Sequence, residues 1–233
     1  MIKVFRSFPI SKIRLLVFDL DGTLVDSKLD LANAVNAMLV HYGRPLLNNK
    51  LVESFVGDGA PMLVRRALNY QWEQKVTDAA VQDGLKFFMA HYRVHKLDNT
   101  LCYKGIPEAL EAIAGRLPQV KMAVLSNKPE GPSRGICEGL GLNKHLFAVY
   151  GGNSFATKKP EPEGANALLR EAGVQPEEAI MIGDSGNDVM TGINAGMWTL
   201  GVNWGFSPQT LIEHPPDVQI DEVGELLRGL GLE

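Results

Sequence analysis

Four short apolar runs, separated by segments with helical periodicity, constrain the fold of this chain more than any other feature. The runs occupy residues 15–18, 122–125, 147–150 and 179–182, and residues 198–202 are a candidate for a fifth. Continuous apolar runs of this length are typical of strands that are buried on both faces, as in a parallel sheet. Between them, apolar residues within 107–117 and 165–172 recur at the spacing of a helix. The alternation predicts an α/β fold with a doubly wound parallel sheet.

The interval 26–100 interrupts this alternation, because its sequence contains no run typical of a buried strand. Apolar residues at helical spacing instead predict one helix over 31–42, a second over 62–70 and later helices within 80–92. Residues 96–100 would then return the chain to the sheet. We therefore expect a core formed by residues 1–25 and 101–233, with residues 26–100 inserted as a helical unit after its first strand.

Composition and charge exclude several classes of protein. With 45% hydrophobic and 21% charged residues, the chain can form a core and is not disordered. Its formal net charge of -4 offers no basic excess for binding nucleic acid. The sequence has no apolar stretch of membrane-spanning length, and basic residues together with Pro9 interrupt any signal-peptide core. Cys102 and Cys137 are too few for a disulfide framework. We expect a cytoplasmic protein, monomeric or homodimeric, without nucleic-acid or membrane partners.

Polar clusters follow four of the apolar runs, at or beyond the points where the predicted strands end. They are Asp19-Leu20-Asp21-Gly22-Thr23, Ser126-Asn127-Lys128, Lys158-Lys159 and Gly183-Asp184-Ser185-Gly186-Asn187-Asp188. In open α/β sheets the ligand crevice lies at the carboxyl ends of the strands. We therefore expect the four clusters to meet at one edge of the sheet.

The charges of these clusters indicate a metal and an anionic substrate. Asp19, Asp21, Asp184 and Asp188 would place up to four carboxylates near one point, where each would raise the pKa of its neighbours. A hard divalent cation relieves this repulsion, and ligation by oxygen alone suits Mg²⁺. A metal beside the ammonium group of Lys159 fits an anionic oxygen substrate such as a phosphate.

Two further details fit phosphate chemistry. Of Asp19 and Asp21, one could attack a substrate while the other handles the proton. Ser126 and the N–H groups after it, at a predicted helix start, could hold phosphate oxygens. Each motif alone also fits a turn or a helix cap. Their joint order on successive strand ends favours a functional site.

These motifs resemble the four motifs of the haloacid dehalogenase (HAD) superfamily, from about Arg14 to about Gly205. The resemblance implies a Rossmann-like core with a small helical cap. It implies that Asp19 is the nucleophile and forms an aspartyl-phosphate. Asp21 would protonate the leaving alcohol and then activate water. Lys159, which directly precedes a Pro-Glu-Pro segment, would neutralise the nucleophile and the phosphoryl group.

The resemblance also implies the metal and phosphate sites. Asp19, the backbone carbonyl of Asp21, and Asp184 would bind Mg²⁺, and Asp188 would support the metal site or Lys159. The phosphate oxygens would be bound by Ser126 and Asn127.

Within the superfamily the sequence is similar to the phosphoglycolate phosphatases, in the stretches 56–60, 103–107, 125–128 and 158–162. This similarity implies hydrolysis of 2-phosphoglycolate to glycolate and phosphate. The cap would read the leaving group through Gly57, Asp58, Gly59 and Arg66, because glycines let the backbone approach a ligand and arginine can pair with a carboxylate.

Three other activities remain open or disfavoured. A phosphomutase resembling β-phosphoglucomutase would use the same residues. A dehalogenase has no need of the acid Asp21. A phospho-acceptor switch protein also gathers carboxylates, a hydroxyl and a lysine at strand ends, but such proteins are much shorter and lack an insert of this kind.

Overall fold

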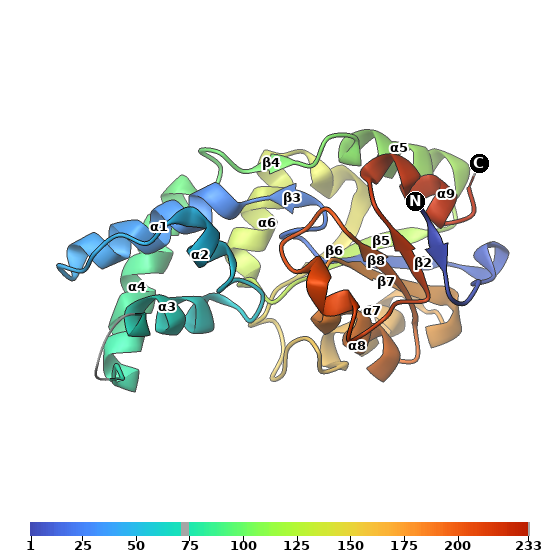
Figure 1. The fold of residues 1–233 in the computed structure, drawn as a ribbon. Helices are drawn as coiled ribbons and strands as arrows, with labels where there is room; N and C mark the ends of the chain where they lie inside the picture. Colours follow the sequence, from blue (N-terminus) through green and yellow to red (C-terminus); the bar gives the residue numbers. More distant parts are fainter. Residues whose placement is uncertain (71–74, 233) are drawn as a thin grey trace. The chain divides into compact units, whose positions relative to one another are not determined.

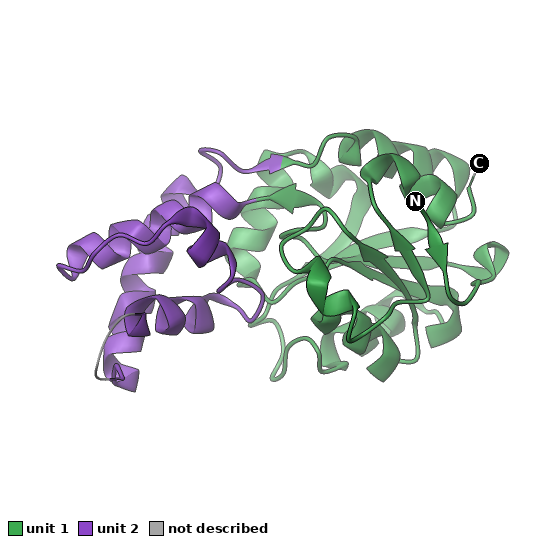
Figure 2. Cartoon of the chain, in the orientation of Figure 1, with its two compact units in different colours: residues 1–26, 102–233 green, residues 27–101 purple. Residues whose placement is uncertain are grey.

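The computed structural model describes residues 1–70 and 75–232, and it divides the chain into two compact units (Figure 1, Figure 2). Residues 1–26 and 102–233 form the larger unit, and residues 27–101 form the smaller one. The sequence predicted divisions after residues 25 and 100. In the part of the chain that the structure describes, none of the helices combines the length and the apolar composition that a membrane span requires.

The larger unit is built on a seven-stranded sheet, counted over the described residues, in the order β1-β9-β8-β7-β2-β5-β6. Its strands are β1 (Lys3–Val4), β2 (Leu15–Phe18), β5 (Lys121–Leu125), β6 (Leu146–Tyr150), β7 (Ala179–Gly183), β8 (Trp198–Val202) and β9 (Val218–Ile220). Only the β1–β9 pair among these is antiparallel. All the strands predicted from apolar runs are present, which confirms the parallel α/β sheet.

Helices cover both faces of this sheet (Figure 1). On one face lie α5 (Ile106–Arg116), α6 (Glu130–Gly139) and α9 (Leu226–Gly229), and on the other lie α7 (Glu163–Ala172) and α8 (Gly186–Asn194). Leu16 and Phe18 of β2 point into the first layer, whereas Leu15 and Val17 point into the second. Because successive strand residues alternate between faces and both faces are buried, the strand reads as a continuous apolar run. The doubly wound arrangement is thereby confirmed.

The smaller unit is helical, as predicted. It contains α1 (Lys28–His41), α2 (Asn49–Glu53), α3 (Ala60–Asn69) and α4 (Asp78–His95). The pattern within 80–92, read as more than one helix, belongs to the single helix α4. The strands β3 (Val25–Asp26) and β4 (Leu101–Cys102) form a two-stranded sheet where the chain passes between the units.

A buried carboxylate fastens the two ends of the smaller unit together. Asp30, in the first turn of α1, is 1% exposed. Its carboxylate accepts hydrogen bonds from Asn99 N and Nδ2 at 3.0 and 2.7 Å, and from Thr100 N and Oγ1 at 2.8 and 2.7 Å. Burial works to raise the pKa of Asp30, but these four hydrogen bonds outweigh it and lower that pKa. The insert is therefore closed at its base by a charged side chain with its own donors.

Candidate active site

The register of the sheet places the polar clusters that begin at Asp19 and at Gly183 next to each other, at the ends of two neighbouring strands. Asp19 directly follows β2 and Asp184 directly follows β7, which is a neighbour of β2 in the sheet. Phe18, the last residue of β2, is aligned with Val124 of β5 on one side and with Ile182 of β7 on the other. Because these three strands are parallel, the residues that follow them emerge at one edge.

Three buried aspartates meet at this edge. Asp19, Asp184 and Asp188 each offer a carboxylate oxygen, and the three oxygens lie within 4.8 Å of one another. Burial raises the pKa of Asp19 to about 6, against the opposing charge of Lys159. Burial together with the charges of Asp188 and Asp19 raises the pKa of Asp184 to about 7. The fold therefore holds negative charge here at a cost that a cation would relieve.

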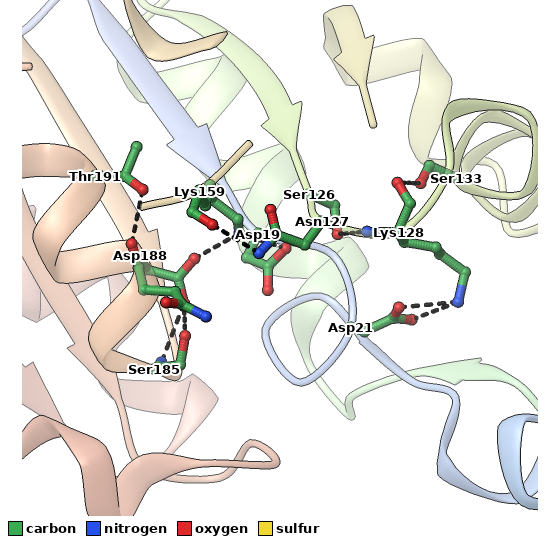
Figure 3. A network of polar contacts seen from close by, with 11 residues as sticks. Asp19, Asp21, Ser126, Asn127, Lys128, Ser133, Lys159, Ser185, Asp188 and Thr191 are labelled. Atoms are coloured by element: carbon green, nitrogen blue, oxygen red, sulfur yellow. Dashed lines mark hydrogen bonds and ion pairs between the residues drawn. The ribbon is translucent and has the colours of Figure 1, made fainter. Parts of the chain in front are cut away.

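Lys159 is the ammonium group of this cluster. Its Nζ lies 2.6 Å from Asp188 Oδ1 and 2.8 Å from Asp19 Oδ1, and its side chain is 3% exposed (Figure 3). Burial disfavours its charge, but Asp188 and Asp19 outweigh burial and raise the pKa of Lys159, so it stays a cation at neutral pH. Lys158, by contrast, is exposed. Asn127 Nδ2 donates to the carbonyl of Lys159 at 3.0 Å and so holds this loop against the end of β5.

Asp188 is held by the start of its own helix. Ser185 caps α8, and Asp188 at the third helical position completes a capping box with it. Asp188 Oδ2 accepts from Ser185 N at 3.1 Å and from Ser185 Oγ at 2.7 Å. Since Oδ1 accepts from Lys159, both oxygens of Asp188 have protein donors. Its clearest role is to fix the ammonium group beside Asp19.

The loop after β8 holds Asp184, and sequence reasoning missed it. Asp184 Oδ2 accepts from Phe206 N at 2.5 Å and from Ser207 N at 3.0 Å. The backbone can come this close only because Gly205 and Gly22 have no Cβ. A Cβ on Gly205 would overlap the Asp184 side chain, and one on Gly22 would lie 2.6 Å from Asp184 Oδ2. The one signal in the sequence was the isolated Gly205 just beyond β8, since such a glycine often marks close backbone approach.

The donor set fits a hard divalent cation. All three carboxylates supply oxygen, and one ammonium group is present to offset their charge. Within the described residues, Asp19 Oδ1 is buried and accepts no hydrogen bond, although the ammonium group of Lys159 lies 2.8 Å away, so this oxygen is available to a cation. Oxygen ligation of this kind suits Mg²⁺.

We expect Gly205→Ala to weaken cation binding by about 10- to 100-fold, because the new methyl group would push the Asp184 carboxylate out of place. Calorimetric titration of the purified protein with Mg²⁺ measures this. Gly115→Ala is the matched control, because a Cβ at that helical position meets nothing within 4 Å. Equal affinity of the two variants would contradict the positioning role of the loop.

Asp21 does not join the acidic cluster. Its carboxylate pairs with Lys128 Nζ, at 2.9 Å from Oδ2 and 3.2 Å from Oδ1 (Figure 3). The left-handed Gly22, with φ of 90°, turns the chain directly after Asp21. Of the four aspartates expected at one point, the structure thus brings together three carboxylates and gives the fourth its own counter-ion.

Ser126 and Asn127 lie buried between β5 and α6. Ser126 was expected near a helix start, but α6 begins at Glu130, so Ser126 is not its cap. Its Oγ instead accepts from Lys128 N at 3.3 Å, and its N donates to Tyr150 O at 3.0 Å. The serine therefore shapes the turn that carries the following two residues.

The residues predicted to recognise the substrate lie in the smaller unit: Gly57, Asp58 and Gly59 directly precede α3, and Arg66 lies in its last turn. Gly57 and Gly59 both adopt positive φ, 128° and 87°, which only glycine adopts readily. Arg66 forms an ion pair with Asp58 and donates to the carbonyl of Phe55 at 2.8 Å. Arg66 thus has partners within its own unit, and its contact with a substrate stays a prediction.

Comparison with known proteins gives consistent matches. The family described as haloacid dehalogenase-like hydrolase matches residues 16–202. A phosphoglycolate phosphatase of Chromobacterium violaceum is 36% identical over 214 residues, covering 92% of this chain and 95% of that protein. One of Rhodospirillum rubrum is 39% identical over 194 residues, covering 82% and 80%. The crystal structure of a predicted phosphoglycolate phosphatase from Haemophilus somnus 129PT has a TM-score of 0.87 at 28% identity, covering 93% and 97%.

Proposed function

The chain belongs to the haloacid dehalogenase-like hydrolases and is a phosphoric monoester hydrolase, and on this premise we propose that it hydrolyses 2-phosphoglycolate to glycolate and phosphate. We propose that the reaction depends on Mg²⁺ and passes through an aspartyl-phosphate on Asp19. The observation that carries the proposal is the buried group of Asp19, Asp184, Asp188 and Lys159, in which Asp19 and Asp184 directly follow the adjacent strands β2 and β7. The substrate is inferred from the names of the relatives.

In the first half of the reaction, Asp19 attacks the phosphorus of the ester. A bond forms between its carboxylate oxygen and phosphorus while the bond from phosphorus to the alcohol oxygen breaks. Asp21 donates a proton to that leaving oxygen, so the product departs as an alcohol. Lys159, 2.8 Å from Asp19, keeps positive charge beside the reacting group.

In the second half, water attacks the phosphorus of the aspartyl-phosphate. Asp21, now a carboxylate, accepts a proton from that water, and Asp19 leaves as a carboxylate. Inorganic phosphate is released and both side chains return to their starting forms. Ser126 and Asn127 would hold the phosphoryl oxygens through both halves.

The metal would be bound by Asp19, Asp184 and the backbone carbonyl of Asp21, with Asp188 behind them. When bound, Mg²⁺ supplies positive charge to the phosphoryl oxygens. The loop at 205–207 orients Asp184, and the capping box of α8 orients Asp188 toward Lys159.

Recognition of the leaving group is proposed for the smaller unit. The backbone of Gly57 and Gly59 and the guanidinium of Arg66 would face the carboxylate of the substrate. Asp58 holds Arg66 in the conformation described above.

The test is release of phosphate from 2-phosphoglycolate and from a panel of other small phosphomonoesters, with Mg²⁺ and with a chelator. We expect release that requires Mg²⁺, with the highest kcat/KM for 2-phosphoglycolate. A preference for another ester would overturn the substrate and keep the phosphatase chemistry. Conversion of glucose 1-phosphate into an isomeric sugar phosphate, without net release of phosphate, would replace the proposal by a mutase.

A further inference from the structure

We propose that Lys128 is a positioning residue that holds the Asp21 carboxyl group in place for proton transfer. The inference rests on the proposed function, because it concerns the proton that Asp21 gives to the leaving alcohol and later takes from water. Lys128 has no role in the mechanism derived above.

The ammonium group of Lys128 contacts both carboxylate oxygens of Asp21. A single ammonium nitrogen of Lys128 lies 2.9 Å from one oxygen of Asp21 and 3.2 Å from the other (Figure 3). Engaging both oxygens restricts rotation of the carboxyl group about its terminal bond. The side chain of Lys128 is 4% exposed and that of Asp21 is 10% exposed, so water competes little for the pair.

The backbone that carries Lys128 is also fixed. Its N donates to Ser126 Oγ at 3.3 Å, and its carbonyl accepts from Gly152 N at 2.8 Å. A Cβ on Gly151 would lie only 2.5 Å from this carbonyl, so the glycine loop after β6 packs directly against it. Because the backbone of Lys128 is held in place, its ammonium group can fix the orientation of the Asp21 side chain that it contacts.

Stability alone is a weak reason for such a pair. Removing two charges from water costs free energy that their attraction only partly returns, and apolar replacements of buried pairs are often neutral. Moreover, the two buried lysines of the site contact different aspartates: Lys159 lies beside the nucleophile Asp19, and Lys128 lies beside the acid Asp21. This division matches two tasks, charge neutralisation at Asp19 and orientation at Asp21.

Lys128 itself exchanges no proton in this scheme. The proton moves from the Asp21 carboxyl oxygen to the leaving oxygen as the ester bond breaks, and in the second half from water to Asp21. Throughout both halves, the contact with Lys128 keeps the carboxyl group within reach of both partners.

The test compares two leaving groups in Lys128→Met. We expect kcat/KM for 2-phosphoglycolate, or for the best alkyl ester of the panel, to fall by about 10- to 100-fold. With 4-nitrophenyl phosphate, whose leaving group departs without a proton, we expect a change within about threefold. Because kcat/KM reports the steps up to departure of the leaving group, slow hydrolysis of the aspartyl-phosphate does not mask the difference. Lys144→Met, which removes a surface lysine that is 65% exposed, should leave both values unchanged.

A double-mutant cycle separates positioning from general damage. In an Asp21→Asn background, adding Lys128→Met should cause no further loss with the alkyl ester, because Lys128 acts only through the acid. Lys128→Gln, which keeps a hydrogen-bond donor, serves if the methionine variant fails to fold, and should lose less. Equal losses on both esters, or losses that multiply in the double variant, would overturn the proposal. Absence of phosphatase activity in the unmodified enzyme would instead overturn the proposed function.

Discussion

Asp19→Asn is expected to lower phosphate release by at least about 10⁴-fold, because an amide oxygen at this position cannot form the aspartyl-phosphate. Steady-state kinetics with the best substrate measures the loss. Rapid acid quenching provides a second readout, since phosphate should remain on the unmodified protein and be absent from the variant.

The loss should not come from unfolding. Burial raises the pKa of Asp19 to about 6, so its ionised form is unfavourable in the folded protein, and a neutral amide of the same shape removes that cost. We therefore expect a thermal midpoint at least as high as that of the unmodified protein without metal. Asp83→Asn, which removes a surface carboxylate that is 63% exposed, is the matched control and should keep full activity. Substantial turnover by Asp19→Asn would show that another group is the nucleophile.

The core strands could be predicted from sequence because burial on both faces leaves a continuous apolar run. Where that condition fails, the pattern fails with it. Both residues of β1 are exposed, and β9 has only three residues at the edge of the parallel part of the sheet. Neither strand carries a run long enough to distinguish it from a loop.

Convergence of the polar clusters could be predicted as well, because parallel strands in register must end together. The directions of side chains could not. Asp19 and Asp21 look alike in the sequence, yet one contacts Lys159 and the other contacts Lys128. Which lysine meets which carboxylate depends on turns at Gly22 and after β5 that no local pattern specifies.

The support of Asp184 was equally hidden, because it comes from backbone N–H groups of Phe206 and Ser207. Backbone donors have no side-chain signature, and the two residues lie some 20 positions along the chain. Only the neighbouring glycine gave any indication. The same reasoning applies to Arg66, whose contacts with Asp58 and the Phe55 carbonyl depend on the exact path of the loop before α3.

Lys159→Met is expected to lower kcat by at least about 10²- to 10³-fold, because it removes the positive charge beside the nucleophile. It should also destabilise the metal-free protein by about 3–5 kcal/mol at neutral pH, since Asp19 and Asp188 lose their buried counter-ion. Lys158→Met is the matched control. Lys158 is the preceding lysine in the sequence, but it is exposed, so its replacement should change activity and stability little.

The pH dependence of that destabilisation gives the sharper test. Burial raises the folded-state pKa of Asp19 from 3.8 to about 6 even with Lys159 opposing it, so removal of Lys159 must raise this pKa further. A carboxyl group with a raised folded-state pKa favours folding below its unfolded pKa, and that contribution is lost as pH rises through the folded value. Urea unfolding of chelator-treated protein should therefore show a small deficit for Lys159→Met near pH 4 and a large one at pH 8. A deficit that is equal at both values, or one that appears in Lys158→Met instead, would mean that the ammonium group of Lys159 does not hold the charge of this site in balance.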